Sequence, residues 1–391
     1  IVDIDVSLDV NGTIKLDGAF PTGSQNTALG NDALASGSLS GGFNTAIGET
    51  ALKTNTSGSS NVAVGRDALE LNTTGCENTS LGQNSMYTNV SGDFNTAVGR
   101  EALYSNTTAN NNTGVGYKAL KANTTGATNT AFGFQSSLTN TTGTLNASFG
   151  DNSFRCNTTG ANNTALGTSA LFNNTTASFN TGVGSEALST NTTGANNVAV
   201  GRLALKANTT GCDNTSVGES TLLLNTEGCR NVAMGNHALD ANTTGDCNVG
   251  IGFGSLSAAT TADFNTMVGA AAGNDITTGA SNTAVGALAL SANTTGCCNT
   301  AVGKDSLLAN TTGHSNTAVG IASLDSNTTG TVNQAFGRRS LCSNTTGDCN
   351  SAFGYFTLAA NSTGECNTAI GNSALAANTT GTSNTAVGQQ A

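Results

Sequence analysis

The 391-residue sequence has little of several residue types on which common folds depend. It contains no tryptophan and one proline, and charged residues make up 9% of it, against roughly 25% in ordinary soluble domains. The scarcity of Glu and Lys excludes coiled coils and long exposed helices, and a single proline excludes collagen and polyproline rods. No apolar stretch approaches the roughly 18–20 residues of a membrane-spanning helix, so we expect no membrane insertion.

The sequence also lacks the residue clusters that carry catalysis, metal binding or nucleic-acid binding. The 13 Lys and Arg are outnumbered by 24 Asp and Glu, and they form no basic cluster. No phosphate-binding glycine loop, zinc-site spacing or paired carboxylate typical of a glycosidase is visible. His237 and His314 are isolated, and we expect both to be solvated. We therefore predict a protein that is not an enzyme, with no catalytic residue, no cofactor, no metal and no nucleic-acid partner.

What the sequence does have is one motif at a fixed interval. Asn-Thr-Ala-(Leu/Ile/Val)-Gly begins at Asn26 and Asn44, and from Asn44 to Asn384 it returns every 17 residues without insertion or deletion. With the Asn of each motif as coil position 1, the consensus is N-T-A-V-G-x-x-A-L-x-x-N-T-T-G-x-x. Glycine stands at position 5 in all 22 copies. Such regularity is specific for a solenoid.

The period and the residue types predict strands. Seventeen residues do not make a whole number of helical turns, and a helical hairpin of this length would leave two fragments too short to be stable. The β-branched T-A-V and the short A-L segments, bounded by Gly and Asn-Thr-Thr-Gly, instead indicate strands and turns. We therefore expect each repeat to be one coil with two short strands and two tight turns. We expect an all-β, parallel β-solenoid (β-roll) of about 21–22 coils over residues 26–391. At about 4.8 Å per coil, the rod would be about 100 Å long.

The pattern inside each coil predicts a core and an association surface. Position 4 is always large and apolar, as in Val64 and Met234, and position 9 is usually Leu, so we expect these two positions to form the core. The small residues at positions 3 and 8, such as Ala63 and Ala68, then face outward if the strands alternate. Because so thin a core buries little apolar surface, we expect this small-residue face to pack against another copy. The predicted partner is the chain itself, as a homo-oligomeric trimer or an end-to-end filament.

The repeat resembles those of fibrous surface proteins. The runs Asn95–Gly99, Asn282–Gly286 and Asn316–Gly320 resemble the head repeats of trimeric autotransporter adhesins, which carry a similar Asn-Ser-Val-Ala-Ile-Gly motif. With A-L and N-T-T-G following, the repeat is also similar to that of phage and algal-virus tail-fibre proteins, and Leu8–Ile14 is similar to a segment that often precedes such repeats. The resemblance implies a left-handed, trimeric β-roll in a surface appendage. The period is longer than in the adhesin heads.

Both ends of the chain differ from the repeat. Apolar and polar residues alternate from the start, and Asn11-Gly12 predicts a hairpin turn within a segment spanning residues 1–25. This segment is either a cap over the first coil or an assembly strand donated to the next subunit. Its apolar residues are Val2, Ile4, Val6, Leu8 and Val10. Since the chain starts without Met and stops in mid-repeat, we expect a processed or partial piece of a longer protein.

Position 12 is nearly always asparagine and often opens an N-glycosylation sequon. Asn-Thr-Thr recurs at this position in many coils, among them those with Asn72, Asn106, Asn123, Asn140, Asn191, Asn293 and Asn378. Two interpretations stand side by side: glycans at these sites, or stacked asparagines that hydrogen-bond from coil to coil. Glu227 breaks one sequon and Ala259 replaces the asparagine in another coil, so neither interpretation makes a single site indispensable.

The cysteines gather at positions 16 and 17. Cys212 and Cys229 occupy the same position in successive coils, as do Cys349 and Cys366. In-register coils would place their Cα atoms about 4.8 Å apart, within disulfide range, so we predict two inter-coil disulfides and an oxidising exterior. Cys229 with Cys247 is a competing pair.

These features predict a structural shaft of an extracellular fibre, in a cell-surface appendage or a virion fibre. The alternative is an adhesin or viral tail fibre that binds a surface glycan or host receptor. A receptor site should concentrate aromatic residues, as around Phe134, Phe154 and Arg155, or Tyr355 and Phe356. These aromatics are few and separated by many coils, which favours the passive shaft.

Overall fold

The computed structural model describes residues 25–391 and shows an all-β chain of stacked coils, with no helix among these residues. Each coil contributes one parallel strand of three residues at positions 2–4, and the described chain holds 22 such strands. The predicted parallel β-solenoid of 17-residue coils is therefore confirmed. The second strand predicted in each coil, at the A-L segment, was wrong: these residues form a turn, because position 9 has a left-handed backbone, as at Leu69 with a φ of 52°. The predicted N-terminal strand, with Val2 to Val10, lies outside the described residues.

The coils fall into two compact units, the first ending at Leu145 and the second running from Asn146 to Ala391. The strands of the first unit are β1 (Thr27–Leu29), β2 (Thr45–Ile47), β3 (Val62–Val64), β4 (Thr79–Leu81), β5 (Thr96–Val98), β6 (Thr113–Val115) and β7 (Thr130–Phe132). Those of the second unit are β8 (Ala147–Phe149), β9 (Thr164–Leu166), β10 (Thr181–Val183), β11 (Val198–Val200), β12 (Thr215–Val217), β13 (Val232–Met234), β14 (Val249–Ile251), β15 (Thr266–Val268), β16 (Thr283–Val285), β17 (Thr300–Val302), β18 (Thr317–Val319), β19 (Gln334–Phe336), β20 (Ser351–Phe353), β21 (Thr368–Ile370) and β22 (Thr385–Val387).

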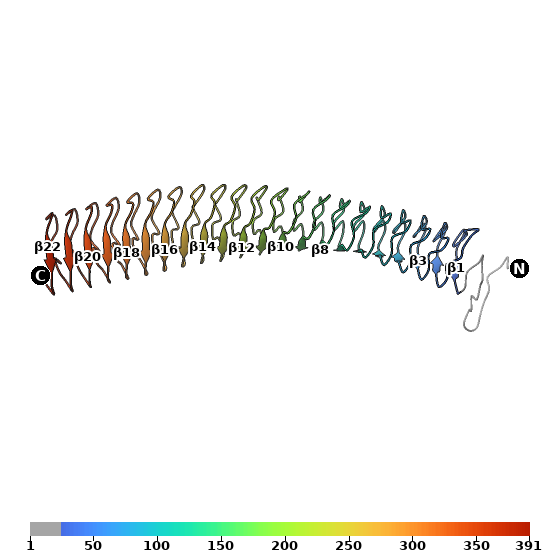
Figure 1. Ribbon diagram of the computed structural model, residues 1–391, viewed down its shortest axis with the longest axis horizontal. Coiled ribbons are helices and arrows are strands. Elements are labelled where there is room, and N and C mark those ends of the chain that lie inside the picture. Colours follow the sequence, from blue (N-terminus) through green and yellow to red (C-terminus); the bar gives the residue numbers. More distant parts are fainter. Residues whose placement is uncertain (1–24) are drawn as a thin grey trace. The chain divides into compact units, whose positions relative to one another are not determined.

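Within each unit, consecutive strands pair in parallel and in register. Ala63 of β3 pairs with Ser80 of β4, so the same coil position lies side by side in neighbouring coils (Figure 1). The turns continue this ladder, since the N–H of Thr73 donates to the carbonyl of Val90 at 2.9 Å. Because hydrogen bonding to the next coil continues outside the strands, an inserted residue would disrupt it. This explains the unbroken 17-residue spacing from Asn44 to Asn384.

Each strand is followed by a glycine at position 5 that no other residue replaces easily. Gly65 has a φ of +131°, and a Cβ there would lie 2.7 Å from the backbone carbonyl of Gly82 in the next coil. Position 5 therefore requires glycine both for its conformation and for its space. The chain then turns through left-handed residues, with φ of 61° at Asp67 and 52° at Leu69. A left-handed leucine costs about 1–2 kcal/mol, which burial of its side chain, worth about 1.5–3 kcal/mol, offsets.

The interior differs from the predicted core. Leu69 at position 9 is fully buried as expected, but so are Ala63 and Ala68 at positions 3 and 8. The position 4 side chains instead face outward: Leu166 is 47% exposed and Ile370 is 43% exposed. The prediction that position 4 fills the core, and that the alanine row packs against another copy, was wrong.

The thinness of the coil is the physical reason for this inversion. The leucine at position 9 reaches across the interior to the inner face of the strand, so only a small residue fits above it. Even at Gly114, a position 3 glycine, an added Cβ would lie 3.3 Å from Cγ of Leu103 in the coil before. A valine or phenylalanine at position 3 would overfill this space, and alternation along the strand then sends position 4 outward.

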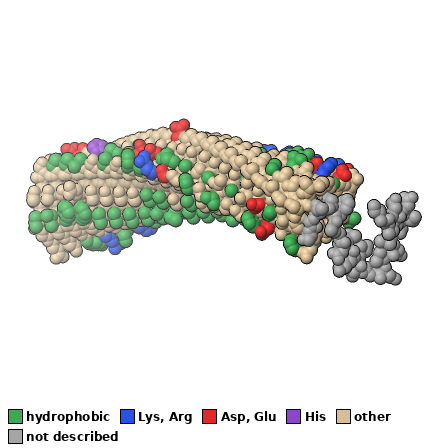
Figure 2. All heavy atoms as spheres, turned by 45° about the vertical axis from the view of Figure 1, so that its right-hand side comes forward, with side chains coloured by type: hydrophobic (Ala, Val, Ile, Leu, Met, Phe, Trp, Pro, Cys, Tyr) green, Lys and Arg blue, Asp and Glu red, His purple; other side chains and the backbone are tan. Residues whose placement is uncertain are grey.

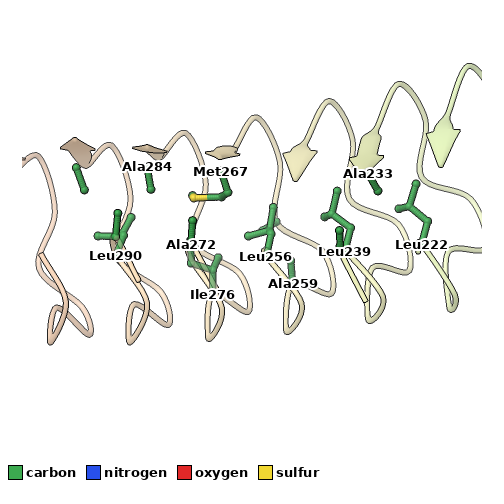
Figure 3. Close-up of a cluster of buried hydrophobic side chains, with 14 of the residues drawn as sticks. Leu222, Ala233, Leu239, Leu256, Ala259, Met267, Ala272, Ile276, Ala284 and Leu290 are labelled. Atoms are coloured by element: carbon green, nitrogen blue, oxygen red, sulfur yellow. The ribbon is translucent and has the colours of Figure 1, made fainter. Parts of the chain in front are cut away.

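One coil of the second unit builds the same core from different residues. Met267, Gly273 and Ile276 stand at positions 3, 9 and 12, where the consensus has Ala, Leu and Asn. Met267 and Ile276 are fully buried, and Figure 3 shows both side chains pointing into the interior. A Cβ on Gly273 would lie 2.7 Å from Sδ of Met267 and 2.9 Å from Cδ1 of Ile276. The two larger side chains thus occupy the space of the missing leucine.

Candidate functional site

The outward side chains at positions 2 and 4 form what we call the outer sheet face. From β8 to β22, position 2 carries Thr, Val, Ser, Ala or Gln, and position 4 carries Val, Leu, Ile, Phe or Met. The charged side chains of the described coils lie outside these strands. Figure 2 shows a continuous band of hydrophobic side chains along the coils towards the C-terminal end. The face is therefore uncharged and repeats at the spacing of the strands, with an apolar row at position 4 beside a mostly threonine row at position 2.

The asparagines of the predicted sequons lie inside the coils. Nδ2 of Asn106 donates to Oδ1 of Asn89 in the preceding coil at 2.8 Å and to the carbonyl of Ala109 at 3.0 Å. Equivalent asparagines are buried, except for the half-buried last one: Asn72, Asn123, Asn140, Asn191, Asn293 and Asn378. A glycan would attach to this same nitrogen, so attachment requires an unfolded coil. The placement favours the interpretation of stacked asparagines.

The asparagine ladder has a gap where the sequence departs from the repeat. Ala259 stands at position 12 of the coil that follows Asn242. Oδ1 of Asn242 is buried without a hydrogen-bond partner among the described residues. A buried carbonyl without a donor costs about 1–3 kcal/mol, so this coil is a local weak point of the stack.

The cysteine pairs predicted from the sequence lie close together. Sγ of Cys212 lies 2.9 Å from Sγ of Cys229, and both are thiols. The hydrogen bond with the Cys229 thiol raises the pKa of Cys212 to about 12. Burial and the neighbouring Cys366 thiol raise the pKa of Cys349. The competing residue Cys247 meets Cys229 through the backbone, its N–H donating to the Cys229 carbonyl at 3.0 Å. The two disulfides stay predictions, and the short distance between the Cys212 and Cys229 sulfurs is compatible with the first of them.

The first unit carries a cluster of aromatic and basic side chains that share a carboxylate. The rings of Tyr87 and Tyr104 stack with their centroids 5.2 Å apart, and Nζ of Lys121 lies 5.7 Å from the Tyr104 centroid. Nζ of Lys121 also lies 2.7 Å from the carboxylate of Glu101, which Lys118 approaches at 4.0 Å. The hydrogen bond from Lys121 holds the pKa of Glu101 below its usual range. These lysines therefore already have a counterion.

A second cluster, on two adjacent coils of the second unit, joins arginines to aromatic rings. The guanidinium of Arg338 lies 6.0 Å from the Tyr355 centroid, and that of Arg339 lies 5.6 Å from the Phe356 centroid. The Tyr355 and Phe356 rings lie 4.6 Å apart, and the neighbouring rings of Phe336 and Phe353 stack at 5.0 Å. We call this set the arginine–aromatic cluster: Phe336, Arg338, Arg339, Phe353, Tyr355 and Phe356.

Sequence reasoning found this cluster only in part. It singled out Tyr355 and Phe356, but it missed Phe353 in the same coil. It also missed Phe336 and the two arginines of the preceding coil. Writing the repeats in register would have shown aromatics stacked above arginines at the same positions. Its other candidate patch does not form as expected, because Phe154 stands at position 9 and is fully buried.

The two histidines lie at the surface of the second unit. His237 lies at the surface with Nδ1 3.1 Å from a carboxylate oxygen of Asp240, and His314 is exposed. Within residues 25–391, no group of three or more His, Cys, Asp and Glu side chains could hold a metal ion. These residues also include no helix long and apolar enough to cross a bilayer.

Comparison with protein-family models gives no match, and neither does comparison with curated proteins. The functional argument therefore depends on the geometry of the coils.

Proposed function

We propose that the chain is the shaft of an extracellular fibre or surface appendage, a non-catalytic rod that associates with copies of itself through the outer sheet face. The observation that supports this proposal is the absence of charge from positions 2 and 4 of the described coils, although charged residues occupy the neighbouring turns. A solvated sheet face ordinarily carries charged as well as polar residues, and a long exposed apolar row such as that at position 4 marks an interaction surface.

The size of the face fits such an interface. Fifteen strands of three residues, β8 to β22, make a face of about 700 Å² at about 4.8 Å between strands and about 3.3 Å per residue. Stable interfaces bury about 800 Å² on each partner. The second unit alone supplies nearly this area. A second copy carries the same face with the same spacing between strands, so it could cover the face along its length.

Charge placed on the face tests the proposal. In the variant V285K/V302K, two outward side chains of adjacent strands β16 and β17 become lysines. We expect the wild-type chain to form oligomers at micromolar concentration, and the variant to form mostly monomers, because burying an unpaired ammonium is costly. Light scattering coupled to size exclusion measures the masses, and negative-stain images show whether rods associate side by side.

The matched control places the same two lysines elsewhere. T295K/T312K adds equal charge at exposed position 14 threonines in the same coils. It should associate like the wild type, and circular dichroism should show that both variants are folded. A wild-type chain that stays monomeric up to about 100 µM, or two variants with the same mass, would contradict self-association through this face.

A further inference from the structure

Two adjacent coils of the second unit depart from the repeat mainly on the outside. In the coil that begins at Asn333, the outward residues at positions 2, 4, 6 and 7 are Gln334, Phe336, Arg338 and Arg339. In the next coil they are Ser351, Phe353, Tyr355 and Phe356. The interior keeps its usual residues: Ala335, Leu341 and Asn344, followed by Ala352, Leu358 and Asn361, are all fully buried. The stacking of these coils therefore does not need the unusual outer residues.

The two arginines lack the carboxylate that accompanies cations elsewhere. Every other basic residue at position 6 pairs with an acid: Arg66, Arg100 and Lys304 with the acid that follows each of them, and Arg202 with Glu219 of the next coil. Nine of the described Lys and Arg side chains have a carboxylate oxygen within 4.0 Å. Arg338 and Arg339 have none, and both are exposed. Burial raises the pKa of the half-buried Asp325. The charge of Arg339 lowers the same pKa, but it acts from beyond ion-pair distance.

The aromatic rings hold the guanidinium groups in place while leaving them accessible. Arg338 lies near the ring of Tyr355, which is 46% exposed, and Arg339 lies near that of Phe356. A guanidinium near an aromatic ring can still donate hydrogen bonds from its edge, in the fork geometry that matches a carboxylate or sulfate. An exposed ring edge beside it offers the kind of apolar surface on which a sugar ring can pack.

We propose that the arginine–aromatic cluster binds an anionic glycan, with the guanidinium groups of Arg338 and Arg339 pairing with a uronate or sulfate group. The sugar ring packs against the exposed ring of Tyr355, which lies 4.6 Å from that of Phe356. Positions 6 and 7 lie in the turn beyond the strand, at the margin of the outer sheet face. The two arginines therefore remain accessible when that face is covered, and the site does not require the proposed shaft function.

Binding of defined polymers to the full chain tests the site. The probes are polygalacturonate for the uronate, dextran sulfate for the sulfate, methyl-esterified polygalacturonate as the uncharged match and polyglutamate as an acidic peptide. We expect the chain to bind polygalacturonate or dextran sulfate, with an affinity that falls as salt is added. R338A/R339A and Y355A/F356A should each lower this affinity about tenfold or more. Alanines at these positions are compatible with the coil, since Ala270 and Ala271 occupy them elsewhere.

A charge-matched control separates the site from the net charge of the protein. R202A/K206A also removes two cations, which are paired with Glu219 and Glu186, and should leave binding unchanged. Equal losses in R338A/R339A and R202A/K206A would overturn the site, as would the absence of binding to both anionic polymers. Polyglutamate bound as tightly as the glycans would overturn the glycan as ligand. Oligomer masses, measured separately, should be unchanged in all these variants.

Discussion

At the scale of single residues, the coil depends on contacts that the consensus only hints at. The consensus shows glycine at positions 5 and 15 alike, yet only the glycine at position 5 has a positive φ. At position 5 the φ is near +130°, whereas position 15 has an ordinary φ and Ala109, Ala177 and Ala262 replace it. A sequence shows that a glycine recurs, but not whether conformation or space requires it.

Substitution at these two glycines should therefore have unequal effects. G286A puts a side chain at a φ of +141°, 2.6 Å from the backbone of Gly303, and should destabilise its coils by about 2 kcal/mol or more. A Cβ on Gly296, at position 15, would lie 2.4 Å from the Gly313 carbonyl oxygen, but φ there is not positive and other coils accept alanine. We therefore expect G296A to cost less than G286A. Hydrogen exchange of the amides in these coils measures the local effect. Equal losses would show that φ does not limit position 5.

The Cys212–Cys229 pair should form a disulfide in the presence of an oxidant. Oxidised glutathione would accept two electrons as the two thiols lose their protons and the Sγ atoms, now 2.9 Å apart, bond. We expect peptide mapping without reduction to recover the two cysteines linked. Because the pKa of Cys212 is about 12, the reaction should be slow at neutral pH and faster at pH 9.

The variant C229S is the control for this pairing, since it leaves Cys212 without its partner. Recovery of a Cys229–Cys247 link in the wild type would contradict the predicted pairing.

At the scale of the coil, the sequence predicted the number, the spacing and the parallel stacking of the coils, because hydrogen bonding from coil to coil imposes the period. It predicted two strands in each coil, whereas the structure has one. It misplaced the core, since alternation alone does not say which face of a three-residue strand points inward. The thickness of the coil decides this, and Leu69 reaching across towards the strand sets that thickness. The sequence revealed only part of the arginine–aromatic cluster, because its side chains meet across coils, between residues 17 positions apart.

The unusual core of the coil with Met267 tests whether volume governs packing. G273L alone should destabilise the protein by about 1–3 kcal/mol, because the new leucine meets Met267 and Ile276. The triple variant M267A/G273L/I276N rebuilds the consensus core and should be within about 1 kcal/mol of the wild type. Its new asparagine also offers an acceptor to Asn293, whose Nδ2 now donates to Gly296. Urea unfolding followed by circular dichroism compares the variants. A triple variant as unstable as G273L would contradict compensation.

At the scale of the whole molecule, each coil depends on its immediate neighbours, so coils should be removable as units. Deleting residues 299–315 takes out one 17-residue coil and joins Cys298 to Asn316 at matching positions. We expect the shortened chain to fold, with a melting temperature within a few degrees of the wild type, as in other repeat arrays.

Deleting residues 299–314 instead removes one residue fewer, so that one extra residue remains between two coils. A one-residue slip turns inward-facing side chains outward, so this variant should lose cooperative melting in the affected coils. Equal behaviour of the two deletions would contradict in-register stacking as the source of stability.

The uniform period has a consequence for how such a gene can change. Recombination between two identical points of neighbouring repeats removes or adds seventeen codons, which keeps the reading frame and yields a chain that is one coil shorter or longer. Every product of such an exchange meets the same hydrogen-bonding partners at its junction. The length of the protein can therefore drift in steps of one coil between related lineages, while the residues inside each coil stay fixed.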